Sequence, residues 1–277
     1  MPEREQPVIS VRDLTIRYGD GCPHCRTSLE KNRCRVCGTV WAANHISLDV
    51  YDGEVLGIVG ESGSGKSTLM QSLYFDREPT SGQAFLKQYR DGTANIWEAS
   101  DAQKRQIRNL MMGMVYQNPV MGLRMDYSAA SNIAEKIIAA GSRNAGQMTN
   151  RAKELLEAVE ILTSRMGEAP KNFSGGMQQR VQISMALANN PSLLLLDEVT
   201  TGLDLSVQAK VLDLIRRIKS TYHISVLLVS HDLAVIRMLA DRTVVMLDGQ
   251  IVESGLTDQI LEDPQHAYTQ QLVHSLL

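Results

Sequence analysis

The sequence contains no apolar run long enough to cross a membrane, which would need about 20 consecutive apolar residues. Its first residues, 1–6, are mostly polar and lack the apolar core of a secretory signal peptide. The formal net charge of −3 and the pI near 6.1 give no general attraction to nucleic acid or to anionic lipid. We therefore expect a cytoplasmic protein with no membrane span and no direct nucleic-acid contact, which reaches a membrane only through a partner.

Cysteine is absent outside residues 22–37, where all four cysteines of the chain lie. Internal repeats and low-complexity segments are also lacking. The 277 residues, 43% of them hydrophobic, suit one large globular domain with a sizeable core. Clustered cysteines in an intracellular chain favour a metal site over disulfides.

A glycine-rich segment between two structured stretches carries the clearest chemical signal. Residues 55–59 are apolar and predict a buried strand, and residues 68–73 predict a helix. The segment between them has the glycine spacing and the final Gly-Lys-Ser of a phosphate-binding loop: Gly60, Glu61, Ser62, Gly63, Ser64, Gly65, Lys66 and Ser67. A turn with an exposed lysine is the alternative, but both flanking elements fit a loop that binds a nucleoside triphosphate.

The residue types in this loop match the chemistry of a polyphosphate. Glycines allow backbone N–H groups to turn inward, and the following helix N-terminus, at Ser67 and Thr68, adds partial positive charge. Lys66 is placed for the β- and γ-phosphates, and the Ser67 hydroxyl for Mg²⁺.

An acidic pair follows a second apolar stretch, residues 193–196. A carboxylate at the carboxyl end of a central strand lies where open α/β sheets bind ligands. Asp197 is placed to hold Mg²⁺, and Glu198 is the natural general base for a water that attacks the γ-phosphate. Two solvated, inert acids are the alternative.

Ser174, Gly175 and Gly176 begin a predicted helix that runs to about Asn190. A helix N-terminus with glycines favours close backbone approach to an anion. Because Ser-Gly-Gly is also common in ordinary turns and helix caps, it is weak evidence for an anion site by itself. Its position shortly before the acidic strand strengthens that interpretation.

The pattern of predicted strands and helices indicates an α/β fold. Residues 8–18 and 45–50 alternate as strands of an antiparallel β subdomain, interrupted by an insertion at 21–40. Residues 118–172 predict a helical subdomain. The repeated strand–helix–strand units elsewhere predict a mostly parallel core sheet, and residues 261–277 form a C-terminal tail.

With these motifs in this order, the chain resembles the nucleotide-binding subunits of ATP-binding cassette (ABC) proteins from about residue 8 to the C-terminus, and we expect the nucleotide-binding domain itself at residues 8–260. The resemblance implies further roles: Gln117 senses the γ-phosphate and Mg²⁺, His231 contacts the γ-phosphate, and Tyr18 stacks on adenine. Alone, such a histidine or tyrosine would be an ordinary surface or core residue. Met177 and Val199 depart from the family pattern, and we expect them to alter local packing only.

The resemblance also implies a head-to-tail homodimer. ATP would lie between the phosphate loop of one protomer and Ser174, Gly175 and Gly176 of the other. Residues 201–204, which end in Asp204, match the loop that crosses between protomers. ATP binding would then close the dimer, and hydrolysis would release it.

Cys22, Cys25, Cys34 and Cys37 form two Cys-x-x-Cys pairs separated by eight residues. Four thiolates match the tetrahedral ligand set of structural Zn²⁺. Iron–sulfur ligation or reactive thiol pairs are the alternatives, and His24 is expected to be a bystander. The insertion could also form a docking surface, which the sequence does not decide.

Residues 73–76, 116–133 and 254–259 are similar to cassette proteins of the bacterial carbon–phosphorus lyase system. This resemblance implies an ATPase that docks on the soluble lyase core and couples ATP turnover to phosphonate breakdown. The alternative is the ATPase of a peptide or nickel importer, which would share the ATP chemistry and differ in its partner.

Overall fold

The computed structural model describes residues 6–25 and 27–274. The remaining residues include one position of the predicted insertion and the last three of the predicted tail, which lie outside the described part. The chain divides into two compact units, one formed by Met1–Ser100 and Leu227–Leu277 and the other by Asp101–Val226. We describe each unit by itself.

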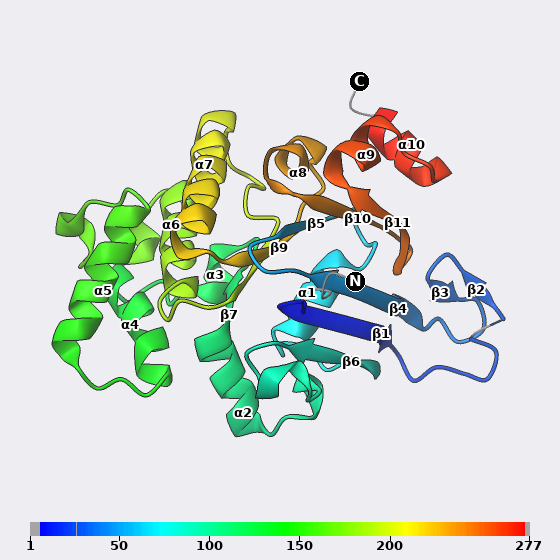
Figure 1. The fold of residues 1–277 in the computed structure, drawn as a ribbon, viewed down its shortest axis with the longest axis horizontal. Coiled ribbons are helices and arrows are strands. Elements are labelled where there is room, and N and C mark those ends of the chain that lie inside the picture. Colours follow the sequence, from blue (N-terminus) through cyan, green and yellow to red (C-terminus); the bar gives the residue numbers. More distant parts are fainter. Residues whose placement is uncertain (1–5, 26, 275–277) are drawn as a thin grey trace. The chain divides into compact units, whose positions relative to one another are not determined.

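The first unit contains a five-stranded antiparallel sheet in the order β2-β3-β4-β1-β6. Its strands are β1 (Ile9–Tyr18), β2 (Leu29–Glu30), β3 (Arg33–Cys34), β4 (Val40–Val50) and β6 (Ser81–Leu86). The short β2–β3 hairpin lies beside the end of β1 and the start of β4 (Figure 1). The predicted interruption of an antiparallel strand pair by the cysteine segment is therefore confirmed.

The first unit also contains the strand–loop–helix that begins the nucleotide motif, together with the C-terminal segments. Parallel strands β5 (Val55–Val59) and β10 (Arg242–Leu247) pair with each other, and β11 (Gln250–Leu256) pairs antiparallel with β10. The helices are α1 (Lys66–Leu73), α8 (Leu233–Leu239), α9 (Thr257–Glu262) and α10 (Ala267–His274), with short 3-10 turns at Arg90–Gly92 and Ile96–Glu98.

The second unit is mainly helical around the parallel pair β7 (Met112–Val115) and β8 (Leu193–Asp197). Its helices are α2 (Asp101–Gln106), a π-helical turn (Ile107–Met111), α3 (Pro119–Gly122), α4 (Ala129–Ala139), α5 (Ala145–Ala158), α6 (Gly175–Ala186) and α7 (Leu205–Tyr222). Short 3-10 turns lie at Thr163–Arg165 and Pro170–Asn172, and β9 (Ser225–Val229) spans the boundary between the units. Helix α6 ends at Ala186, earlier than the predicted Asn190.

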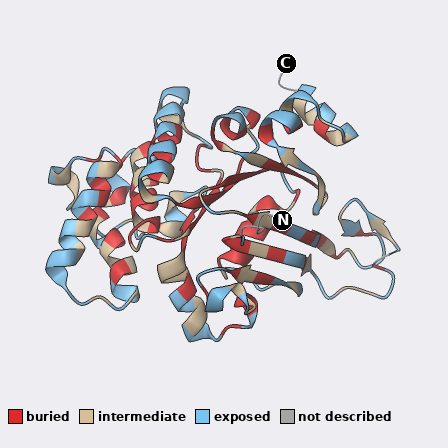
Figure 2. Ribbon diagram, viewed as in Figure 1, coloured by how far each residue is buried: buried red, intermediate tan, exposed pale blue. Residues whose placement is uncertain are grey.

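Every residue of β5, β8 and β9 is buried (Figure 2). Such strands must be covered on both faces, which explains their continuous apolar sequences. The fold is thus α/β with parallel pairing at its core and an antiparallel β subdomain, as the sequence predicted. The domain and subdomain limits 8–260 and 118–172 stay predictions. Among the described residues, no helix is both long and apolar enough to cross a membrane.

Candidate functional site

The phosphate loop between β5 and α1 can be formed only by glycine at two of its positions. Gly60 has φ +152°, and a Cβ there would lie 2.1 Å from the Met246 carbonyl oxygen. Gly65 has φ +103°, and its Cβ would lie 1.9 Å from the Ala42 carbonyl oxygen. Real Cβ atoms do not approach an oxygen this closely, so any side chain would displace the loop.

Lys66 is buried within this loop, at 4% exposure. Its Nζ donates hydrogen bonds to the carbonyl oxygens of Gly60 (2.7 Å) and Glu61 (2.8 Å). Helix α1 begins at Lys66, and its N-cap Gly65 provides no side-chain cap, so Ser67 and Thr68 lie in an uncapped first turn. The ammonium group and the helix N-terminus therefore act on the same concave loop, as a polyphosphate site requires.

Tyr18 lies next to the start of α1. Its hydroxyl is 3.1 Å from the Thr68 hydroxyl, and the Arg77 guanidinium lies 4.3 Å from the centre of its ring. The ring is 38% exposed. The structure thus places the predicted adenine-stacking residue beside the phosphate-loop helix, while stacking itself stays a prediction.

His231 is exposed and follows the carboxyl end of β9 in the first unit. The N–H of the preceding Ser230 donates to the carbonyl of Ile58, near the end of β5 (3.1 Å). Asp232 caps α8 by accepting a hydrogen bond from the Ala234 N–H (2.8 Å). The chain turn that carries His231 is therefore fixed on both sides, and it lies near the strand end from which the phosphate loop begins.

In the second unit, the side chains of Gln117 and Glu198 meet. The Gln117 amide donates to Glu198 Oε2 (3.1 Å), and the Thr201 hydroxyl donates to the same oxygen (3.2 Å). Glu198 has a left-handed backbone, with φ +47°, directly after the buried Asp197 that ends β8. Non-glycine residues rarely adopt this conformation, and its cost is often tolerated at functional sites.

The predicted anion site at α6 has an open first turn. Ser174 occupies the N-cap position, but its side chain makes no capping hydrogen bond. A Cβ on Gly175 would meet only the Leu203 side chain at 3.8 Å, whereas one on Gly176 would lie 2.4 Å from Val207 of α7. Gly176 is thus required for helix packing, and the Ser174 hydroxyl and the Gly175 backbone are available to a ligand.

Asp204 is the N-cap residue of α7. It accepts hydrogen bonds from the Ser206 hydroxyl (2.7 Å) and the Val207 N–H (3.0 Å), and these bonds lower the pKa of Asp204. The predicted role of Asp204 between protomers concerns a second chain and stays a prediction.

The four cysteines of the insertion meet at one point. Their sulfur atoms all lie within 4.8 Å of one another, and three pairs are 3.5–3.8 Å apart. Four sulfurs bound tetrahedrally at about 2.3 Å from Zn²⁺ would lie about 3.8 Å apart. His24 is not part of this group. The arrangement fits a metal with four thiolate ligands.

The thiols of this group differ in acidity. Partial burial, followed by hydrogen bonding within the cluster, raises the pKa of Cys22 to about 12. Hydrogen bonds with Thr39 lower the pKa of Cys37 to about 6. The lowered pKa favours the thiolate form of Cys37, which is the form that binds metals.

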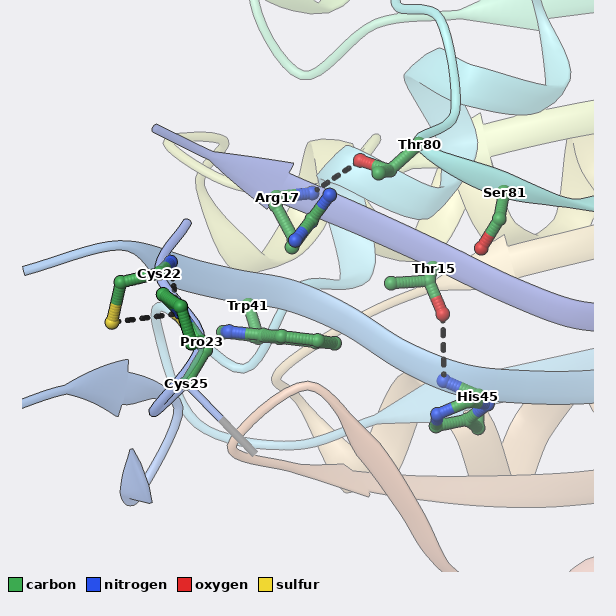
Figure 3. A pocket seen from close by; sticks show the side chains of 9 residues that line it. All are labelled: Thr15, Arg17, Cys22, Pro23, Cys25, Trp41, His45, Thr80 and Ser81. Carbon is green, nitrogen blue, oxygen red and sulfur yellow. Dashed lines mark hydrogen bonds between the residues drawn. The ribbon is translucent and has the colours of Figure 1, made fainter. Parts of the chain in front are cut away.

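Residues of the cysteine insertion and of the antiparallel sheet together line an open pocket of about 390 Å³ (Figure 3). Arg17 lies over the Trp41 ring, 5.3 Å from its centre, and Trp41 packs against Cys25 and Cys34. The remaining lining residues come from the sheet and from the insertion: Thr15, Cys22, Pro23, His45, Thr80 and Ser81. The insertion is therefore packed on the sheet.

One contact to the phosphate loop was not predicted from the sequence. The Glu61 N–H donates to the hydroxyl of Tyr268 in α10 (2.8 Å). The two residues are 207 positions apart, and no local pattern marks Tyr268 as a partner of the loop.

Comparison with known proteins agrees with this geometry. The sequence profile of the ABC transporter family matches residues 43–201. The chain is 43% identical to the putative phosphonates utilization ATP-binding protein PhnK of Escherichia coli, over 98% of each chain. It is 36% identical to the oligopeptide transport ATP-binding protein OppF of Lactococcus lactis, over 87% of this chain and 74% of that protein.

The solved structures that resemble the fold include dimeric cassettes. A post-hydrolysis dimer of the ATP-binding cassette MJ0796, bound to ADP and Pi, has a TM-score of 0.75 and 26% identity, covering 90% of this chain and 98% of that one. CbiO1 from Clostridium perfringens, part of the ABC transporter complex cbiONQ, has a TM-score of 0.76 and 23% identity, covering 94% of this chain and 92% of that one.

Replacing Gly65 with alanine tests the close approach in the loop. We expect Gly65→Ala to lower the free energy of unfolding by about 2–4 kcal/mol, because the new Cβ meets the Ala42 carbonyl in addition to the strain at positive φ. Gly63→Ala is the matched control: Gly63 has φ +85° but nothing within 4 Å of its Cβ position, so we expect about 1 kcal/mol. Urea unfolding of both variants measures the difference, and equal losses would contradict the steric explanation.

Proposed function

The chain belongs to the ABC transporter family and is an ATPase of that family, and we propose that its ATP turnover serves phosphonate breakdown. The observation that carries this proposal is the 43% identity to PhnK along 98% of both chains. This likeness extends beyond residues 43–201, the part common to the wider family.

We propose a specific role for each residue of the ATP site. Lys66 would leave the carbonyls of Gly60 and Glu61 and bind the β- and γ-phosphates. Ser67, Gln117 and Asp197 would hold Mg²⁺, which neutralises charge on the phosphate oxygens. Tyr18 would stack on adenine, and His231 would contact the γ-phosphate.

Glu198 would accept the proton of the attacking water. Its carboxylate is oriented by hydrogen bonds from Gln117 and Thr201, so its position is set before the substrate arrives. Gln117 would thus link the metal to the general base. Both residues follow the carboxyl ends of strands that pair in parallel, where α/β folds bind ligands.

We propose that the active form is a head-to-tail homodimer closed by ATP. Ser174, Gly175 and Gly176 of one protomer would contact the nucleotide of the other, with Asp204 in the crossing loop. The Ser174 side chain makes no capping hydrogen bond, and little space is occupied around the Cβ position of Gly175. Both observations support this role, as do the dimeric structures of a related cassette.

The proposed partner of this dimer is the soluble carbon–phosphorus lyase core, in the cytoplasm. Exposed apolar side chains lie shortly after Gln117: Val120 is 59% exposed, Met121 63% and Tyr127 58%. Apolar side chains gathered on a surface favour a protein partner. A peptide importer is the second candidate, because OppF is 36% identical over 87% of this chain.

For the cysteine insertion we propose a structural Zn²⁺ held by Cys22, Cys25, Cys34 and Cys37. The geometry of the four sulfurs supports this assignment. The apolar cluster of the insertion is small: Cys25, Cys34 and Trp41 are buried in it, and Cys22 and Leu29 pack partly buried against them. A metal would therefore supply much of the stability of the hairpin.

Removing the proposed general base should separate ATP binding from hydrolysis. We expect Glu198→Gln to lower kcat by about 100-fold or more and to leave the Kd for ATP within about threefold. Glu157→Gln, an exposed glutamate of α5, is the matched control and should behave like the wild type. A steady-state ATPase assay and calorimetric titration measure the two quantities, and full hydrolysis by Glu198→Gln would refute the assignment.

The metal proposal predicts about one zinc per chain in the purified protein. Elemental analysis should find less than about one fifth of this in Cys25→Ser, together with a lower melting temperature, because a four-thiolate site loses a ligand. His24→Ala should keep the full zinc content. Iron in the wild type, or unchanged zinc in Cys25→Ser, would overturn the proposal.

The partner proposal is tested with a tagged chain expressed in its own host on a phosphonate as sole phosphorus source. Lyase core subunits should co-purify from the soluble fraction, and Met121→Asp should reduce their recovery about tenfold, since it places a charge in the apolar surface. Met238→Asp, at an exposed methionine of α8 outside residues 116–133 and 254–259, is the control. Recovery of a permease from the membrane fraction would instead support the importer.

A further inference from the structure

The Glu61 peptide of the phosphate loop is held from both sides. Its carbonyl accepts a hydrogen bond from Lys66 Nζ (2.8 Å), and its N–H donates to the Tyr268 hydroxyl (2.8 Å). The Lys66 bond lies within the loop, whereas Tyr268 belongs to α10 at the other end of the chain. If Lys66 turns to the phosphates, Tyr268 still holds this peptide.

The N–H of Glu61 does not belong to the first turn of α1, whose N–H groups are the ones expected to bind phosphate. Helix α1 begins at Lys66, so the N–H groups left without helical partners belong to its first turn. Glu61 precedes them by five residues, at the point where the chain leaves β5. The Tyr268 hydroxyl therefore accepts the N–H of Glu61 at the start of the loop and leaves the N–H groups of the α1 first turn to the phosphates.

Helix α10 is itself fastened to β11 through Glu253. The Glu253 carboxylate accepts hydrogen bonds from the N–H groups of Gln265 (2.8 Å) and His266 (3.0 Å), just before α10 begins. A carboxylate at a helix N-terminus is favoured by the helix dipole. Strand β11 thus positions the Glu253 carboxylate, this carboxylate holds the start of α10, and α10 carries Tyr268.

The hydroxyl of Tyr268 is suited to remain neutral beside a polyphosphate. Burial, the largest effect, raises the pKa of Tyr268 above its usual value. A neutral phenol can accept the Glu61 N–H without repelling the phosphates.

We propose that Tyr268 is a positioning residue of the phosphate loop, through which the docking of α10 on β11 sets the affinity for nucleotide. The proposal rests on the ATPase assignment and deepens it. Tyr268 acts through the Glu61 N–H that its hydroxyl accepts: it fixes the Glu61 peptide, and with it the start of the glycine turn. Loosening α10 therefore weakens nucleotide binding at a distance from the phosphates.

The test begins with Tyr268→Phe in the full-length chain, which keeps the ring and removes the hydroxyl. We expect the Kd for Mg²⁺–AMP-PNP, measured by calorimetry, to rise about fivefold, with a parallel rise in the KM for ATP and kcat within about twofold. Tyr222→Phe, which removes a tyrosine hydroxyl bonded to Glu154 (3.3 Å), is the matched control and should leave the Kd unchanged. A Kd for Tyr268→Phe within twofold of the wild type would overturn the proposal.

A double-mutant cycle separates positioning from general stability. Glu253→Ala frees the start of α10 and should raise the Kd about threefold in the wild-type background. In the Tyr268→Phe background it should have no further effect, because the link to the loop is already cut. Equal effects in both backgrounds would refute the link. A wild-type chain that fails to bind the nucleotide would overturn the ATPase assignment, and the proposal with it.

Discussion

The nucleotide site depends on the close approach of the phosphate loop to two strands. Hydrogen atoms at Gly60 and Gly65 face the carbonyl oxygens of Met246 in β10 and Ala42 in β4, at distances where no side chain fits. The same packing holds the loop in a tight curve around the buried Lys66. The Lys66 ammonium group and the first turn of α1 therefore lie on the same loop, an arrangement that suits a polyphosphate.

The other predicted site residues in the second unit lie where a helix begins or where buried strands end. Asp197 ends β8, Gln117 follows β7, and the two strands are parallel neighbours, so Gln117 and Glu198 meet beyond the same edge. Ser174 precedes α6, where backbone N–H groups lack helical partners. These positions combine rigid support with exposed polar groups, which is the condition for orienting a substrate.

The cysteine insertion follows a different principle from the rest of the first unit. The sheet is held by buried side chains along β1 and β4, whereas the four sulfur atoms of the insertion lie close together, with Cys25 and Cys34 packed against Trp41. Because Arg17 covers the same ring, the insertion and the sheet share one packed contact and one cavity. Because the insertion packs on the sheet in this way, a metal held by its cysteines would have a structural role.

The sequence by itself determined the α/β class, the phosphate loop, the acidic strand end and the cysteine cluster, because each depends on residue types at fixed local spacing. The glycine spacing of residues 60–65, a short apolar run before two acids and two Cys-x-x-Cys pairs are visible in the sequence without any distant contact. Only the tertiary structure decided which carbonyls exclude a side chain at Gly60 and Gly65, that Gln117 bonds to Glu198, and that Tyr268 holds Glu61. These contacts join residues between 23 and 207 positions apart. No local periodicity encodes such pairings, since they arise only when strands and helices pack together.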